Sequence, residues 1–384
     1  MHVYRYRSPS LLSQKGLLYD EWYFASKEEL NDPVDLQSKY EFSGKGWKTL
    51  INRLWGENIF ANQVAWYFSS LGPISYDEIV SYFGKHKSAL DSLFLESTEA
   101  WKLSDVKIYK SCLDALEVLL KSYEPGGGYS ISFSRNNSNM LMWSHYAGSH
   151  SGFCLIYRTI DGKLYQCPDR KKDSLTVAEG HHASISPGFT IKDVNYSNAV
   201  NPLDAFRLLP SGYGGEKFNS EDERLDWHKS ATQQLLTKNV CWEYEEECRM
   251  LLLQPKKFVS GVNEYSSLQR LFHYDFDQLV GVIFGARMSS KDKAVIRDII
   301  DMKRSSRYRK LGPEGKRVSF DFLYQQAEIC QYSRDVKIVD HELYMFGTLV
   351  HKGTKQYIDR LEKWRKGHGI TIENGEFSYG PIPF

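Results

Sequence analysis

The acidic stretch WEYEEECRM, residues 242–250, predicts a β-strand that has two carboxylates and an arginine on one face and Glu246 on the other. In an extended chain successive side chains point to opposite faces of a sheet. One face would then carry Glu245, Glu247 and Arg249, with the two carboxylates about 6–7 Å apart. The neighbouring arginine can keep a carboxylate ionised, and the pair can divide the work of binding and orienting two reactants. A solvated acidic strand or helix end is the alternative interpretation.

A second predicted strand, YSISFS at residues 129–134, carries hydroxyl groups on one face. The alternation places Ser130, Ser132 and Ser134 together, and the apolar side chains between them point the other way. Three uncharged hydroxyls suit hydrogen bonding to a ribose or an amide. An ordinary amphipathic edge strand is the competing interpretation.

The segment MLMWSHYAGSH, residues 140–150, predicts a short helix that contains a histidine. Because imidazole titrates near neutrality, His145 is a candidate acid, base or hydrogen-bond donor. A structural histidine packed beside aromatic rings is the alternative. His145 and His150 are five residues apart, which is not the spacing of a helical metal pair, so we expect no metal site.

The distribution of elements around these segments predicts an α+β fold with a mixed or antiparallel β core. Residues 1–46 and 124–290 are rich in strand patterns and contain the candidate site. Residues 47–123 have helical periodicity and indicate a helical insertion. Residues 291–384 indicate a mixed C-terminal extension with a basic patch.

Composition favours a cytoplasmic protein without a membrane partner. The chain has 384 residues, of which 41% are hydrophobic and 25% charged, and 49 Lys and Arg balance 48 Asp and Glu. A net charge of +1 gives no overall field that attracts nucleic acid or an acidic membrane. No apolar run approaches the roughly 20 residues of a membrane span. The first residues lack the apolar core of a signal peptide, and the six cysteines include no C-x-x-C pair.

One basic run remains a candidate for contact with nucleic acid. A solvated surface is the simpler interpretation of these charges, but they form the best such candidate in the chain. The run contains Lys303, Arg304, Arg307, Arg309 and Lys310.

The order of the motifs resembles the bacterial family called domain of unknown function 2971. The resemblance rests on the turn LNDP at 30–33, the blocks SFS at 132–134 and LMWSHYA at 141–147, the block WEYEEECR at 242–249, and VIFG at 282–285. It covers roughly residues 1–290, while the helical insertion and the C-terminal extension have no counterpart. The family name implies no activity.

A more remote resemblance, to mono-ADP-ribosyltransferases of the R–S–E type, implies a chemistry. These enzymes have an arginine on a first strand, S-x-S on a middle strand and E-x-E on a late strand of a split sheet. The resemblance implies that Arg5 holds the phosphates of NAD and that Ser132, with Ser134, supports the nicotinamide ribose. It implies that Glu247 binds the ribose 2′-hydroxyl and stabilises the oxocarbenium-like transition state, and that Glu245 orients or deprotonates the acceptor.

The same resemblance extends to the aromatic residues and includes departures from the pattern. Tyr146 or Tyr244 would stack on the nicotinamide ring, and Trp143 belongs to the same predicted cofactor-binding set. Arg7 competes with Arg5 for the phosphates, since both lie on one face of the first strand. The middle motif reads S-I-S-F-S in place of S-T-S, and the His-Tyr pair stands in the wrong order for the H–Y–E variant.

The sequence therefore leads to three hypotheses. The first is an NAD-using ADP-ribosyltransferase or NAD glycohydrolase, acting as a toxin or antiphage defence effector on an unknown macromolecular acceptor, with NAD as substrate and no metal. The second is a nuclease or other nucleic-acid-directed effector that uses Glu245, Glu247 and His145. The third is a non-catalytic sensor in which the same residues form a structural network.

Overall fold

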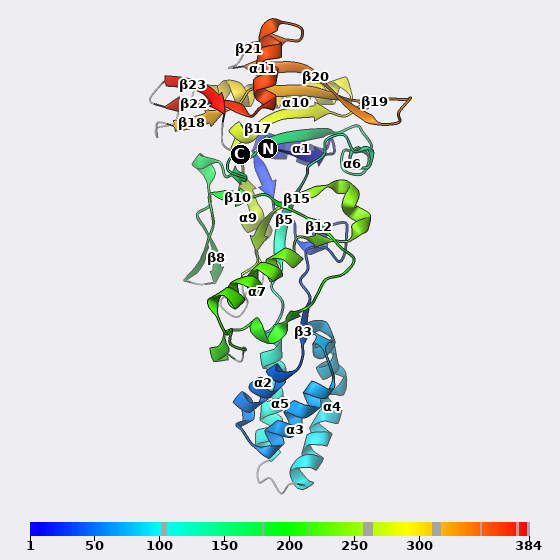
Figure 1. The fold of residues 1–384 in the computed structure, drawn as a ribbon, viewed down its shortest axis with the longest axis vertical. Helices are drawn as coiled ribbons and strands as arrows, with labels where there is room; N and C mark the ends of the chain where they lie inside the picture. The colour runs from blue at the N-terminus through cyan, green and yellow to red at the C-terminus, as the bar shows by residue number, and fades with distance from the viewer. Residues whose placement is uncertain are drawn as a thin grey trace.

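The computed structural model has the predicted α+β fold and an elongated shape (Figure 1). The large sheet lies toward one end and a group of helices lies at the other end. The structure describes the whole chain except residues 101–105, 179, 214, 256–263, 309–315, 346–347, 374–375 and 382–384.

The large sheet has nine strands. Its neighbouring strands are antiparallel, apart from the parallel pair β17 and β19. The strand order is β11 (Lys192–Asp193), β15 (Glu247–Leu253), β5 (Gly128–Ser134), β1 (His2–Arg7), β6 (Phe153–Arg158), β17 (Leu279–Phe284), β19 (Phe322–Ile329), β20 (Val336–Met345) and β21 (Thr348–His351). The predicted C-terminal extension thus supplies three strands of the large sheet.

The three strands that carry the sequence motifs are neighbours in this sheet. β15 pairs with β5 along its whole length, with Glu247 opposite Ser134 and Arg249 opposite Ser132. β1 shares only the pair Tyr4 and Ser134 with β5, and an isolated bridge joins Ala25 to β5 further along. The sheet therefore opens between β1 and β5 beyond Tyr4.

Two apolar cores cover the two faces of the sheet. On one face, Phe133 and Cys248 pack with Leu17 of α1 (Leu11–Leu18) and with α10 (Ser290–Tyr308). On the other face, α6 (Met140–His145) and α11 (Lys355–Arg365) cover β6 and β17. Along β5 and β15, the serines and the charged residues alternate with the apolar residues of the first core. The serines and the charged residues therefore lie on the second face of the sheet.

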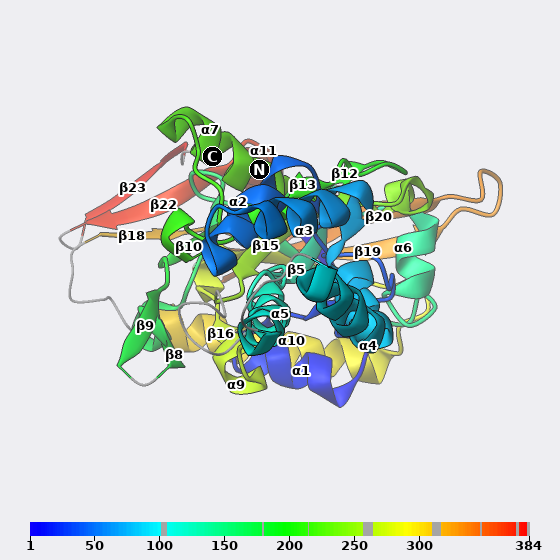
Figure 2. The same ribbon diagram turned by 90° about the horizontal axis from the view of Figure 1, so that it is seen from below.

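A third core lies within the predicted helical insertion, whose helices lie at one end of the molecule in Figure 1 and are seen from that end in Figure 2. Phe206, which comes from a later part of the chain, packs against both Phe42 and Trp47. The insertion is therefore bound to residues 203–227 by an aromatic core. Its elements are α2 (Lys45–Trp55), α3 (Ile59–Ser70), α4 (Tyr76–Ala100) and α5 (Val106–Lys121), with β3 (Tyr40–Phe42), β4 (Ile74–Ser75), β13 (Leu203–Asp204) and the nearby α7 (Glu221–Gln234).

Substitution of two helical glycines, Gly46 and Gly84, should change the free energy of unfolding with opposite signs if this packing is correct. A β-carbon at Gly46 would lie 2.0 Å from the Phe206 ring, whereas one at Gly84 would meet nothing within 4 Å. We expect Gly46→Ala to lower the free energy of unfolding by about 1–3 kcal/mol through overpacking. Gly84→Ala should raise it by about 0.5–1 kcal/mol, because alanine loses less conformational entropy in a helix. Urea unfolding measures both, and equal effects would contradict the packing described.

Candidate active site

The predicted strand over residues 242–250 is wrong in its first half. Val240–Glu245 form a 3-10 helix, η5, that Asn239 caps by accepting a hydrogen bond from the backbone N–H of Cys241. Glu246 then adopts a left-handed conformation with φ of 44°, and β15 begins at Glu247. Glu245 and Glu247 therefore flank a turn, and strand alternation does not place them together.

A buried lysine nevertheless brings the two carboxylates together. The Nζ atom of Lys238 donates to Glu245 Oε2 at 2.6 Å and to Glu247 Oε2 at 3.0 Å. The indole ring of Trp242 covers this ammonium group, with 4.8 Å between Nζ and the ring centroid. No motif in the sequence singled out Lys238, because it precedes the acidic stretch and reaches it only through the fold.

Arg249 links one of these carboxylates, Glu247, to Asp35 in a distant part of the chain. Its Nε and Nη2 atoms donate to the two oxygens of Glu247 at 2.6 and 2.8 Å, and Nη1 and Nη2 donate to Asp35 at 2.7 and 2.5 Å. All of these side chains are buried. We call the set Asp35, Lys238, Glu245, Glu247 and Arg249 the carboxylate network; three acids and two bases give it a net charge of −1 when all are ionised.

The two glutamates have opposite pKa shifts. Burial opposes the ionisation of Glu247, but the charges and hydrogen bonds of Arg249 and Lys238 outweigh it and lower its pKa to about 2. For Glu245 burial dominates and raises the pKa, with only partial compensation from Lys238 and Tyr146. Glu247 is thus a fixed anion, and Glu245 binds a proton more readily.

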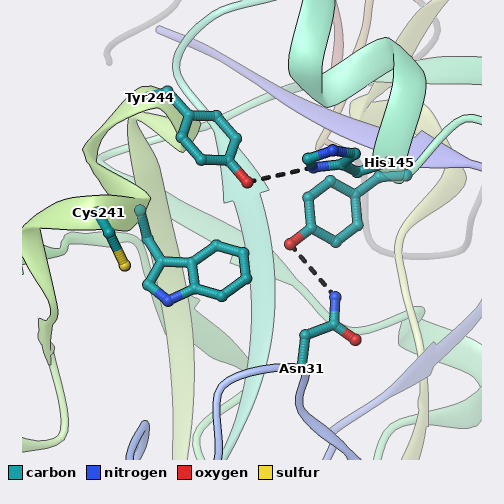
Figure 3. A pocket seen from close by; sticks show the side chains of 6 residues that line it. Asn31, His145, Cys241 and Tyr244 are labelled. Carbon is teal, nitrogen blue, oxygen red and sulfur yellow. Dashed lines mark hydrogen bonds between the residues drawn. The ribbon is translucent and has the colours of Figure 1, made fainter.

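A pocket of about 410 Å³ lies beside this network (Figure 3). The Tyr146 hydroxyl donates to Glu245 Oε1 at 2.5 Å and accepts from Asn31 Nδ2 at 3.3 Å. Tyr146 therefore connects the pocket to the network. The pocket is lined by Asn31, His145, Tyr146, Cys241, Trp242 and Tyr244.

The aromatic side chains of the pocket suit a planar ring. Figure 3 shows His145 and Tyr244 joined by a hydrogen bond, which spans 3.2 Å between Nδ1 and the hydroxyl oxygen. Burial raises the pKa of Tyr146, as does the neighbouring Glu245, so its phenol remains a protonated donor. The predicted residues His145, Tyr146 and Tyr244 meet in one pocket, and Asn31 and Trp242 were not predicted to belong to it.

The serines and the tryptophan of the predicted site have different environments. Ser132 is exposed and its hydroxyl lies beside the Glu247 carboxylate. Ser134 is buried and donates to the Glu245 carbonyl oxygen at 2.7 Å, which holds the end of η5. Trp143 is fully buried, and its indole nitrogen donates to the Asn137 carbonyl oxygen at 2.8 Å. The prediction that Trp143 binds a cofactor is therefore wrong, because its ring fills a core.

Arg5 and Arg7 point away from this site. The Arg5 guanidinium lies over the ring of Phe133, at 5.9 Å from its centroid, on the face opposite Ser132. Arg7 lies on the same face as Arg5, and the phenol of Tyr157 acts electrostatically on both guanidinium groups. The structure therefore does not bring the two arginines predicted to bind phosphate together with Glu247, because they lie on opposite faces of the sheet.

The basic run of the C-terminal region is only partly a surface feature. Lys303 forms an ion pair with buried Asp20 at 2.7 Å, and Arg304 packs over the Phe322 ring at 5.3 Å from its centroid. The predicted solvated surface is wrong for these two side chains, since both turn inward. Arg309 and Lys310 lie outside the described residues, as does the side chain of Arg307.

The described residues contain neither a cluster of metal ligands nor a helix that could span a membrane. Within the described ranges, no three His, Cys, Asp or Glu side chains are grouped so that they could bind a metal ion together. Likewise, none of the helices in the described parts of the chain has the length and apolar character needed to cross a membrane.

Fold and site together define an α+β protein with an aromatic pocket backed by buried carboxylates. Residues 142–250 match the family described as "Protein of unknown function (DUF2971)", which confirms the predicted resemblance over that segment. The matched segment contains most of the pocket residues and four of the five members of the carboxylate network. Searches of curated proteins and of solved structures each returned no match. The resemblance to mono-ADP-ribosyltransferases stays a prediction.

The dependence of the free energy of unfolding on pH in the acid range tests whether Glu247 is an anion with a low pKa. Its folded pKa of about 2 lies below the ordinary value of 4.5, so its stabilising contribution is complete above pH 4.5 and is lost as the pH falls toward 2. The difference corresponds to about 3 kcal/mol. We expect Glu247→Gln to be less stable at pH 7 and to lose less stability than the wild type below pH 4.5.

Urea unfolding across this pH range makes the measurement. Glu243→Gln is the matched control, because Glu243 is exposed on η5, the short helix that precedes Glu247. If the free energy of unfolding fell by the same amount in the wild type and in Glu247→Gln between pH 4.5 and pH 2, Glu247 would not be an anion with a lowered pKa.

Proposed function

We propose that the pocket binds the nicotinamide end of NAD and that the chain acts as an ADP-ribosyltransferase or an NAD glycohydrolase. The observation that carries the proposal is the 2.5 Å hydrogen bond from Tyr146 to Glu245, which links an aromatic pocket to a buried carboxylate. Such chemistry fits an effector, a toxin or a defence protein, that modifies a macromolecule or depletes NAD.

The reaction would break the bond between the nicotinamide nitrogen and ribose C1′. Nicotinamide leaves as a neutral molecule, and C1′ forms a bond with an oxygen of water or of the acceptor, which loses its proton. Positive charge develops on the ribose in the transition state. The net negative carboxylate network supports this step, because fixed charges of opposite sign in a buried site stabilise developing charge.

The side chains divide into three roles under this proposal. Tyr146, Tyr244 and Trp242 offer rings against which nicotinamide can pack. Glu245 orients the acceptor hydroxyl and takes its proton, and a raised pKa improves a carboxylate as a base near neutrality. Glu247 supplies fixed negative charge beside Ser132, and it holds the lysine that positions Glu245.

The adjacency of the motif strands also supports the proposal. The strands with the E-x-E, S-x-S and arginine motifs are three consecutive neighbours, β15, β5 and β1. Residues from the first two strands meet on one face, as a shared substrate would require. Arg5 faces the other side, so the proposal assigns the NAD phosphates to no residue.

One observation favours the structural alternative. Both oxygens of Glu247 already accept hydrogen bonds from Arg249, and one of them also accepts from Lys238. A purely structural network predicts that Glu247→Gln lowers stability without affecting any activity. The nucleic-acid hypothesis has less support, because Lys303 and Arg304, two residues of the basic run, turn inward.

The first test is nicotinamide release from NAD, with and without cell extract. We expect Glu245→Gln and Glu247→Gln to reduce release by about 100-fold or more, because each removes a charge from the reaction centre. Glu243→Gln should retain wild-type release, since its side chain is exposed. Circular dichroism shows whether each variant is folded.

Two results would contradict the proposal. One is a folded wild-type protein that releases no nicotinamide in buffer or in extract. The other is release that persists at the wild-type rate in folded Glu245→Gln, which would place the chemistry away from the pocket.

A further inference from the structure

A group of buried hydrogen-bond donors lies on the opposite face of the sheet from the pocket. The rings of Trp22, Tyr157 and Tyr274 pack together, with centroids 5.3–6.1 Å apart. Each residue is at most 1% exposed. The Tyr157 hydroxyl lies near the indole nitrogen of Trp22, the hydroxyl of Tyr274 and the guanidinium of Arg5. None of these contacts gives the indole nitrogen or either phenol oxygen a hydrogen bond within normal limits of distance and angle. Buried polar groups of this kind are rare, so three in contact require an explanation.

Two arginines of β1 point into the same place. Arg5 pairs with Leu155 across the strands, so Tyr157, two residues further along β6, is its diagonal neighbour on the same face. The Arg5 guanidinium lies 5.9 Å from the centroid of the Phe133 ring, which in turn packs edge-on against the Tyr157 ring at 5.7 Å. Arg7 follows Arg5 on the same face of β1. Both are partly exposed, so solvent reaches them. Burial lowers the pKa of Arg7 to about 10 and also lowers that of Arg5. In the described part of the chain, no carboxylate forms an ion pair with either guanidinium.

Asp20, an acidic residue whose charge acts on Tyr274, is paired with other cations. Asp20 acts on Tyr274 electrostatically, but it forms ion pairs with Arg170 at 2.9 Å and Lys303 at 2.7 Å. The site thus combines two cations, two phenols and an indole N–H, and none of the carboxylates described in the structure is ion-paired with its cations.

We propose that Arg5, Arg7, Trp22, Tyr157 and Tyr274 form a binding site for a tetrahedral oxyanion, a phosphate ion or the phosphate group of a larger molecule. Guanidinium groups bind such oxyanions through paired, charge-assisted hydrogen bonds. The phenols and the indole N–H would donate to the remaining oxygens. This site is separate from the aromatic pocket, because the sheet lies between them, and it does not depend on the proposed NAD chemistry.

Isothermal titration with inorganic phosphate, and separately with AMP, tests the proposal. We expect saturable binding of at least one of them, weakened about tenfold or more in Arg5→Gln and in Arg7→Gln, because each loses charge-assisted hydrogen bonds. Arg287→Gln is the matched control, since Arg287 is an exposed arginine outside this site and its replacement removes the same charge.

A second readout covers the case in which an arginine variant does not fold. In the wild-type protein labelled with ¹⁵N-tryptophan, the indole resonance of Trp22, assigned with Trp22→Phe, should shift along the same titration. Binding of phosphate indicates a free ion, and binding of AMP alone indicates a phosphate group on a larger molecule. Absence of binding for both, a Trp22 resonance that does not move, or affinity unchanged in both folded arginine variants would overturn the proposal.

Discussion

The ammonium group of Lys238 holds two buried carboxylates that would otherwise repel each other. It donates to Glu245 and Glu247, which stand on either side of the turn between η5 and β15. Leaving a buried charge without its partner typically costs about 3–5 kcal/mol. Lys238 therefore fixes this turn from the side-chain side, while Ser134 and Asn139 hold its backbone through the carbonyl oxygens of Glu245 and Tyr244.

The same interaction connects the fold to the chemistry. Arg249 extends the network to Asp35, and Tyr146 extends it to the pocket. Because three acids face two bases, the network retains a negative charge beside a cavity lined by aromatic rings. This combination is the reason for proposing a substrate that carries a planar ring and develops positive charge. On the other face of the sheet the charge is positive, since no carboxylate among the residues that the structure describes forms an ion pair with Arg5 or Arg7.

Local sequence patterns predicted much of the sheet, the helical insertion and half of the pocket. The S-x-S strand and the short helix that carries His145 were predicted because each has its periodicity within a few residues. Lys238 and Asp35 were missed, since they reach the site only through tertiary contacts. Glu245 was placed beside Glu247 for the wrong reason, because the left-handed turn at Glu246 replaces the expected strand alternation. A sequence pattern also does not say which face of a strand meets a site, and this was the error for Arg5.

The most direct test of the account is a crystal structure of Glu245→Gln with NAD bound. The substitution preserves the shape of the side chain and should slow turnover enough for intact NAD to be seen. The account predicts the nicotinamide ring in the pocket, in contact with Tyr146 and Tyr244, and the attached ribose next to residue 245 and Ser132. Nicotinamide bound elsewhere on the molecule, or a pocket that stays empty at saturating NAD, would contradict it.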